Sequence, residues 1–182
     1  MMIVDSMKVQ LWVLVILIGG ALPVLAQPES YRNEVIEKWK NAGAYTLEVA
    51  RLMPDSGYSF KPVAEEMSFK EQLLHSASNM LWLSSAHLSK QTPPFDYKSL
   101  QQRNGLPKRE IVALLEQALQ YAQTAIEQLP DAELDQKVDF FAGPKTKRQI
   151  IHLMHDHLTH HRAQAIVYLR LKGITPPKYI GW

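Results

Sequence analysis

Residues 157–164 read His-Leu-Thr-His-His-Arg-Ala-Gln, and their spacing decides both the predicted fold and the predicted chemistry. At about 100° per residue on a helix, His157, His161 and Gln164 point into one narrow arc. The apolar residues that share this arc are Ile150, Leu153, Met154, Tyr168 and Leu171. Because burying an unpaired polar group is costly, imidazoles on such a face need partners, and a metal ion can satisfy several of them at once. The stretch therefore predicts a helix that carries a metal site.

A third imidazole is available from an earlier helical stretch. His75 lies among leucines, and its own helical face carries Glu71, Asn79 and Trp82. Together with His157 and His161 it would supply three imidazoles from two facing helices. Catalytic zinc is often held by three protein ligands with one open position, but imidazole suits other metals equally. We therefore expect a divalent ion, either Zn, Ni, Fe or Mn, without a choice among them.

Other interpretations of the histidines and of Gln164 stay open. A single histidine on an apolar helix is more often a core residue bonded to a backbone carbonyl. His160 is a third ligand-type residue in the stretch and could bind the ion, support a ligand or be exposed. Gln164 could bond a ligand imidazole, line a pocket or be structural. His152 and His155 point away from the arc, and we expect them to be solvated and outside the site.

The remaining chain predicts an all-α four-helix bundle. Apolar residues recur at helical spacing over residues 29–53, 68–89, 107–129 and 146–172. Ser68 with Glu71 forms a capping box, Thr146 can cap the last helix, and Gly173 can end it. No strand pattern is present. The long connections over residues 93–107 and 130–144 predict crossovers in place of simple up-down-up-down connectivity.

Composition excludes several classes of protein. The chain has 182 residues, a net charge of +2 and mixed charge signs along its length, so it presents no basic stripe for nucleic acid. It has no cysteine, which excludes disulfides and thiolate ligands. We expect one domain over residues 27–182.

The first 26 residues predict a signal peptide. Lys8 precedes an apolar run from Leu11 to Ile18, Pro23 breaks it, and Val24-Leu25-Ala26 offers a cleavage site. The run is shorter than the roughly 20 residues that a spanning helix needs. The sequence therefore predicts cleavage after Ala26, a periplasmic or secreted protein, and no stable membrane anchor after cleavage. Met7 is a second possible start.

Two segments resemble a known family. The segments Phe69-Lys-Glu-Gln-Leu-Leu-His75 and Asp156-His-Leu-Thr-His-His-Arg-Ala-Gln164 look like the two signatures of the DinB-like (DinB/YfiT) family of candidate metalloenzymes. The tail that follows Tyr168 continues the pattern. The resemblance implies a four-helix bundle with unusual crossovers, and a divalent metal held by His75, His157 and His161. Ala163 stands where the family commonly has glycine.

Three classes of function follow. The first is a metal-dependent enzyme of the hydrolase or transferase type that acts on a small-molecule substrate, with Glu71 as the nearest candidate base. The second is a metal-bearing module that binds a small ligand without chemistry. The third is a structural bundle whose histidines only pack. The sequence leaves these three open, and it also leaves open whether the chain forms a homodimer.

Overall fold

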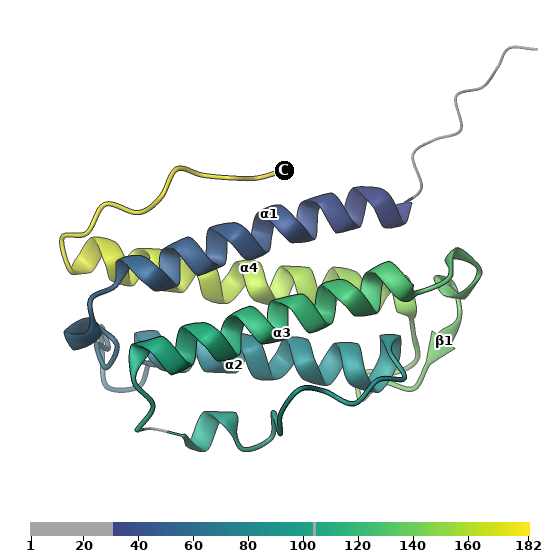
Figure 1. Ribbon diagram of the computed structural model, residues 1–182, viewed down its shortest axis with the longest axis horizontal. Coiled ribbons are helices and arrows are strands. Elements are labelled where there is room, and N and C mark those ends of the chain that lie inside the picture. The colour runs from purple at the N-terminus through teal and green to yellow at the C-terminus, as the bar shows by residue number, and fades with distance from the viewer. Residues whose placement is uncertain (1–30, 104) are drawn as a thin grey trace, which may run out of the picture.

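The computed structural model describes residues 31–103 and 105–182, and four α-helices dominate them (Figure 1). The helices are α1 (Tyr31–Leu52), α2 (Phe69–Leu83), α3 (Lys108–Gln128) and α4 (Lys147–Leu171). The predicted signal peptide, residues 1–26, lies outside the described residues. The predicted all-α bundle is confirmed in its main elements.

The helix ends follow the predicted capping chemistry. Ser68 and Glu71 form a capping box at the start of α2, and Thr146 and Gln149 form another at the start of α4. Gly173 has φ 72°, a left-handed conformation that suits glycine after a helix. The helical segment after Leu83 continues only as a π-helical turn, Ser84–Leu88.

Short elements occupy the connections. One-turn 3₁₀ helices lie at Asp55–Gly57, Leu100–Gln102 and Asp131–Glu133. The antiparallel strands β1 (Lys137–Val138) and β2 (Lys145–Thr146) form a small hairpin, which the expectation of a strand-free chain missed. Strands of two residues are too short to show an alternating apolar pattern, so no sequence signal predicted them.

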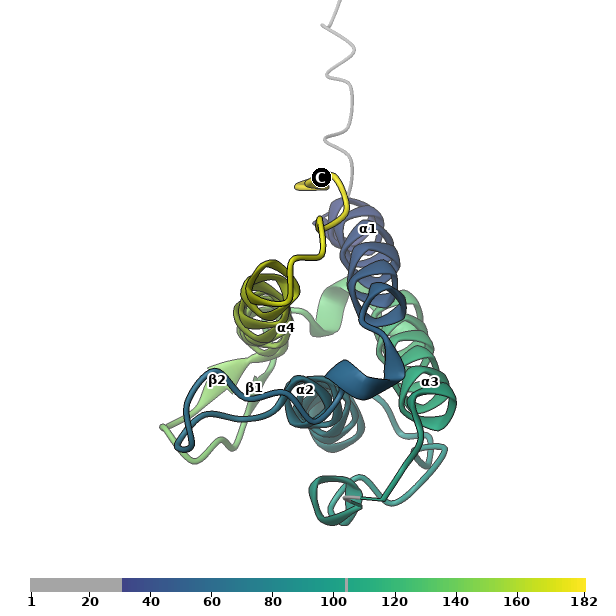
Figure 2. The same ribbon diagram turned by 90° about the vertical axis from the view of Figure 1, so that its left-hand side faces the viewer.

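The order of the helices around the bundle confirms the predicted departure from simple up-down-up-down connectivity. The view along the helices shows α1 beside α3, α3 beside α2, α2 beside α4, and α4 beside α1 (Figure 2). Helices α1 and α2 are consecutive in the chain but lie diagonally across the bundle, as do α3 and α4. The connections over residues 53–68 and 129–146 therefore cross the bundle diagonally, whereas residues 89–107 join the neighbouring helices α2 and α3.

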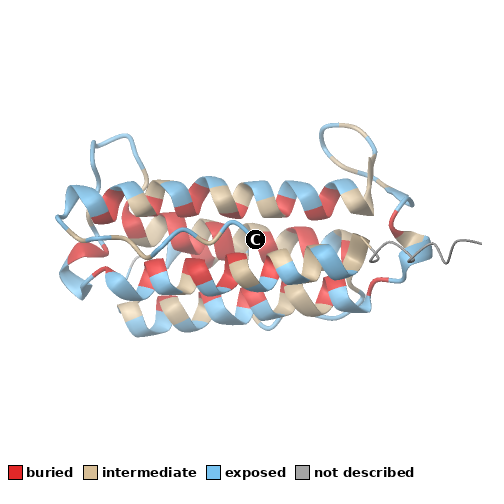
Figure 3. Ribbon diagram, turned by 90° about the horizontal axis from the view of Figure 1, so that it is seen from above, coloured by how far each residue is buried: buried red, intermediate tan, exposed pale blue. Residues whose placement is uncertain are grey.

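The core lies between the four helices, where buried residues recur along each helix (Figure 3). The fully buried Trp39 of α1 donates its indole N–H to the carbonyl of Leu119 in α3 at 3.1 Å, so its polar atom is satisfied. No helix among the described residues is long and apolar enough to cross a membrane.

The buried face of α4 differs from the predicted arc. Ile150, Met154 and Tyr168 are buried as expected, but Leu153 and Leu171 are 39% and 58% exposed. The cause is that α4 packs against both α1 and α2, so its buried face also includes Ile151, Leu158, Arg162 and Leu169. At about 100° per residue, the centre of this face lies about 80° from His157. His157 and Gln164 therefore lie at one edge of the buried face.

Because the buried face of α4 is centred away from His157, the environment of His155 also differs from the prediction. We expected this side chain to be solvated, but it is half-buried at the other edge of the face, with its ring 6.5 Å from that of Trp39. Burial lowers the pKa of His155 to about 4. His152 is exposed as expected, and its Nε2 lies 3.1 Å from the hydroxyl of Tyr31.

Candidate metal centre

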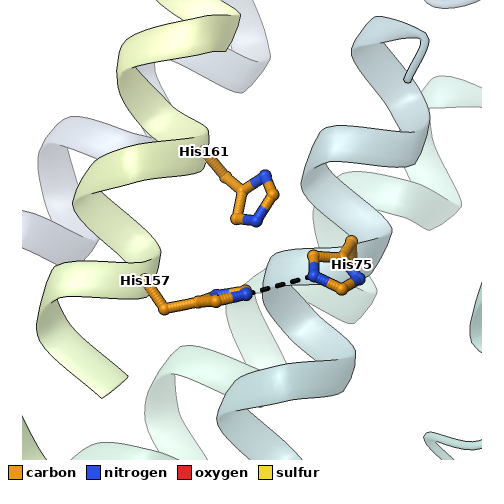
Figure 4. Close-up of side chains that lie close together, drawn as sticks. All are labelled: His75, His157 and His161. Carbon is orange, nitrogen blue, oxygen red and sulfur yellow. Dashed lines mark hydrogen bonds between the residues drawn. The ribbon is translucent and has the colours of Figure 1, made fainter. Parts of the chain in front are cut away.

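Three imidazoles converge between α2 and α4. His75 projects from α2, and His157 and His161 project from successive turns of α4 towards it (Figure 4). One ring nitrogen of each residue lies within 4.8 Å of the other two. Nε2 of His75 is 3.1 Å from Nε2 of His157, and the ring centroids of His161 lie 4.6 and 4.4 Å from theirs. We refer to these residues as the histidine triad.

The spacing within the triad fits one metal ion. Two nitrogens that each lie 2.0–2.1 Å from a tetrahedral ion are about 3.3 Å apart. The observed 3.1 Å between the Nε2 atoms of His75 and His157 is close to that value. Without an ion, one of these two nitrogens must carry a proton for the contact to be favourable. The donor set therefore suits a divalent cation such as zinc, and the triad could hold one.

Gln72 fixes the orientation of one triad ring. Its side chain is only 1% exposed, and its amide oxygen accepts a hydrogen bond from Nδ1 of His161. An amide oxygen can only accept, so Nδ1 of His161 carries the proton and Nε2 keeps its lone pair. This is the arrangement by which outer residues prepare metal-binding histidines. Sequence reasoning missed Gln72, although a glutamine one turn before His75 on an apolar helix was a usable signal.

Gln72 also connects the triad to the two residues predicted around it. Its amide nitrogen donates to the amide oxygen of Gln164 and to the hydroxyl of Tyr168, the latter at 3.3 Å. The amide nitrogen of Gln164 lies 2.7 Å from Nε2 of His160, which is exposed. Gln164 and His160 are therefore placed outside the triad, linked to it through hydrogen bonds.

Electrostatics keeps the triad neutral. Burial, followed by the neighbouring histidines, lowers the pKa of His161 to about 3. Burial and the nearby His75 lower the pKa of His157 to about 4. The pKa of His75 is also lowered, first by burial and then by His160. Neutral imidazole is the form that binds metal, so all three side chains are ready to ligate at neutral pH.

Two buried polar atoms near this arrangement lack hydrogen-bond partners among the described residues. One is Nδ1 of His157, and the other is Oδ1 of Asn79, one turn after His75 on α2. Native structures leave few buried polar atoms unpaired, and these exceptions often mark sites that bind an ion or a water molecule. An ion in the triad would bind Nε2 of His157, the nitrogen that faces His75, so the unpaired Nδ1 is left as a donor that a water molecule could satisfy.

A pocket of about 190 Å³ opens beside His75. The other residues that line it are Lys61, Glu65, Glu66, Met67 and Glu71. Glu71 accepts hydrogen bonds from the backbone N–H and the hydroxyl of Ser68, at 2.6 and 2.7 Å, and pairs with Lys61 at 3.4 Å. These hydrogen bonds, followed by the charge of Lys61, lower the pKa of its carboxyl group. The predicted base thus lines the pocket, but its carboxylate already caps α2.

The remaining histidines lie outside the triad. His152 and His155 contact α1, on the side of α4 away from α2. His87 lies in the π-helical turn, and its ring packs against Trp82 and Phe140 at 6.2 and 5.9 Å. Phe140 belongs to the connection between β1 and β2, so this hairpin covers the end of α2.

Comparisons with known proteins agree with the arrangement of the helices. A family model described as the DinB family matches residues 27–180. The uncharacterized protein YjoA of Bacillus subtilis is 24% identical over 146 residues, which cover 79% of this chain and 92% of YjoA. The crystal structure of YjoA, a DinB-like protein, superimposes with a TM-score of 0.60 at 22% identity, covering 81% of this chain and 96% of that one. A DinB-like protein from Bacillus cereus gives a TM-score of 0.55 at 18% identity, with 81% and 97% covered.

Proposed function

The chain belongs to the DinB family, and we propose that it is an exported protein that binds a divalent metal ion through its histidine triad and uses it to act on a small molecule. The observation that carries this proposal is the convergence of three neutral imidazoles at the edge of the bundle, next to a pocket. A histidine cluster in the centre of the core would have no access for a substrate. His157 lies at the edge of the buried face of α4, and His75 lines the pocket.

His75, His157 and His161 would hold the ion. A divalent ion with three protein ligands keeps at least one open position, where it supplies Lewis-acid chemistry to a substrate or to water. The chain's own contribution is the orientation of the ligands. Gln72 accepts the Nδ1 proton of His161, and its burial keeps that hydrogen bond away from solvent. A reaction of the hydrolase or transferase type fits this arrangement.

Glu71 is the residue that we propose as proton acceptor. It lines the pocket with His75, and its lowered pKa keeps it ionised at neutral pH. The substitution Glu71→Gln separates this role from capping, because glutamine at the same position also completes a capping box. If Glu71 is the base, the variant retains its stability and its metal but loses turnover.

A second candidate function is a metal-bearing module that binds a small ligand without chemistry. The observation that favours it is that the Glu71 carboxylate is occupied by Ser68 and Lys61, which leaves it a weak base. Turnover of any substrate that depends on the bound metal would decide against the module. Saturable binding without turnover would decide for it.

Export is proposed from the sequence of residues 1–26, where a lysine, an apolar run and Val24-Leu25-Ala26 follow in the order of a signal peptide. The mass of the N-terminal peptide of the protein isolated from its natural cell tests this. A mature protein that begins at Gln27 supports export, and an intact chain that begins at Met1 or Met7 contradicts it.

Thermal unfolding with and without a chelator tests metal binding. Metal bound only to the folded state raises its stability, so the wild type should lose thermal stability when the chelator is added. His75→Ala, His157→Ala and His161→Ala should each abolish this difference, since a site with three ligands has no spare donor. His155→Ala is the matched control, because this histidine is half-buried on the same helix but contacts Trp39. If the triad variants lose as much thermal stability as the wild type when the chelator is added, the three histidines have only a structural role.

A further inference from the structure

Arg162 of α4 is a buried cation that has no counter-ion among the residues described by the structure. Its side chain is 7% exposed, and among the described residues no ion pair involves it. Its guanidinium donates to the carbonyl of Ala42 at 3.2 Å and to the hydroxyls of Thr46 and Thr159 at 3.5 and 3.4 Å. All three acceptors are neutral, and the distances exceed the 2.7–2.9 Å that is typical of charge-assisted hydrogen bonds. The positive charge is therefore solvated only weakly by the protein.

This guanidinium lies between two cavities. A groove of about 370 Å³ is lined by residues of α1, α4 and the C-terminal segment, and Arg162 forms part of its wall. A second cavity of about 230 Å³ shares Thr159, Arg162 and Tyr179 with it. In Figure 1 the C-terminal segment runs back alongside α1 and α4. Contacts of the ring of Tyr179 with that of Tyr45, at 6.4 Å between centroids, hold it there.

The walls of the groove are mainly apolar. Arg162 stacks over the ring of Tyr45 with Cζ 4.9 Å from the centroid. The groove is also lined by Thr159, Ala163, Ile166, Val167, Arg170, Pro177 and Tyr179, of which Arg170 is exposed. An apolar groove of this volume with one buried charged group has the composition of a small-molecule site. Arg162 follows His161 directly, but about 100° of helix rotation separates the two, so Arg162 contacts α1 while His161 contacts α2.

We propose that this groove is a second ligand site, separate from the histidine triad, which binds a small monocarboxylate with an apolar body. The planar guanidinium matches the geometry of a carboxylate, and the ligand charge would neutralise a cation that the protein leaves uncompensated. The apolar body would contact Ile166 and Val167.

Calorimetric titration with hexanoate and its neutral analogue hexanamide tests this site. The wild type should bind hexanoate saturably. Its affinity for hexanamide should be lower by a factor of about ten or more, because only the carboxylate pairs with Arg162. A carboxylate could also bind a metal ion in the triad, so the titration is repeated with His157→Ala. Binding that persists in this variant belongs to the groove, whatever the fate of the proposed metal function. Binding that vanishes there, or equal affinity for both probes, overturns the proposal.

Two substitutions of exposed residues supply the matched pair of variants. Val167→Asp places a carboxylate on the wall of the groove, at a position that is 48% exposed and tolerant of charge. The added charge should weaken hexanoate binding by about tenfold or more, since it repels the ligand and competes for Arg162. Leu171→Asp adds the same charge one turn further along α4, at a residue that lines neither cavity, and should bind hexanoate as the wild type does. Equal hexanoate affinity in both variants would show that Arg162 only ties α4 to α1.

Discussion

Replacing Gln72 by leucine should weaken metal binding without removing any metal ligand. The side chain is buried, and its amide oxygen accepts the Nδ1 proton of His161. Leucine is of similar size but cannot accept a hydrogen bond, so the His161 ring would lose both its fixed tautomer and its orientation. Loss of such outer partners typically costs about 10- to 100-fold in metal affinity. This range corresponds to about 1.4–2.8 kcal/mol of binding free energy.

The same substitution also destabilises the metal-free protein. It leaves Nδ1 of His161 and the amide oxygen of Gln164 without their partner, and each unsatisfied buried group costs about 1–3 kcal/mol. Stability alone therefore cannot test the role of Gln72. The assay is competitive titration of the metal-free protein with zinc against a chromophoric chelator, which reports affinity directly.

Two further variants make the test specific. Gln72→Glu keeps an oxygen that accepts the His161 proton, so zinc affinity should be retained even if the buried charge lowers stability. Ser84→Ala is the control for lost stability, because this fully buried hydroxyl donates to the carbonyl of Met80 and has no contact with the triad. Wild-type zinc affinity in Gln72→Leu would refute the orienting role. A loss in Gln72→Glu as large as that in Gln72→Leu would refute it as well.

The stability of the metal-free protein should decrease as the pH falls from about 6.5 towards about 4. Burial lowers the pKa of His157 and His155 to about 4 in the folded state, whereas histidine in the unfolded chain takes up a proton near pH 6.5. Denaturant unfolding at pH 7 and pH 5 measures this, and equal free energies of unfolding at the two values would contradict the burial of these side chains. Met154→Ala should lower the free energy of unfolding by about 2–5 kcal/mol because Met154 is fully buried, whereas Leu153→Ala should lower it much less. Similar losses in the two variants would show that the buried face of α4 is assigned wrongly. Ser68→Ala removes the side-chain cap of α2 and should cost about 1 kcal/mol, measured by thermal unfolding, while a neutral result would show that Glu71 alone suffices as the cap.

The sequence allowed the number of helices and their caps to be predicted, because these features depend on local spacing. Ser68 with Glu71 and Thr146 with its partner Gln149 mark helix starts whatever the rest of the chain does. The triad was predicted for a similar reason, since histidines at i and i+4 share one side of any helix. The family resemblance agreed on the same three residues.

The features that were missed depend on how the helices pack. The buried face of α4 is set by two neighbouring helices, and its displacement exposed Leu153 and partly buried His155. Neither change can be inferred from α4 alone. The bond from Gln72 to His161 joins residues 89 positions apart in the chain, so helical spacing could place Gln72 on a face but could not name its partner.

Metal content measures the central claim most directly. The protein purified without chelators from its natural source, and analysed for its elements, should contain one divalent ion per chain. The variant that combines His75→Ala, His157→Ala and His161→Ala should contain none after the same purification, although it remains helical by circular dichroism. A wild-type protein that stays free of metal, even after incubation with zinc, nickel, iron or manganese, would contradict the account and leave the histidines as packing residues.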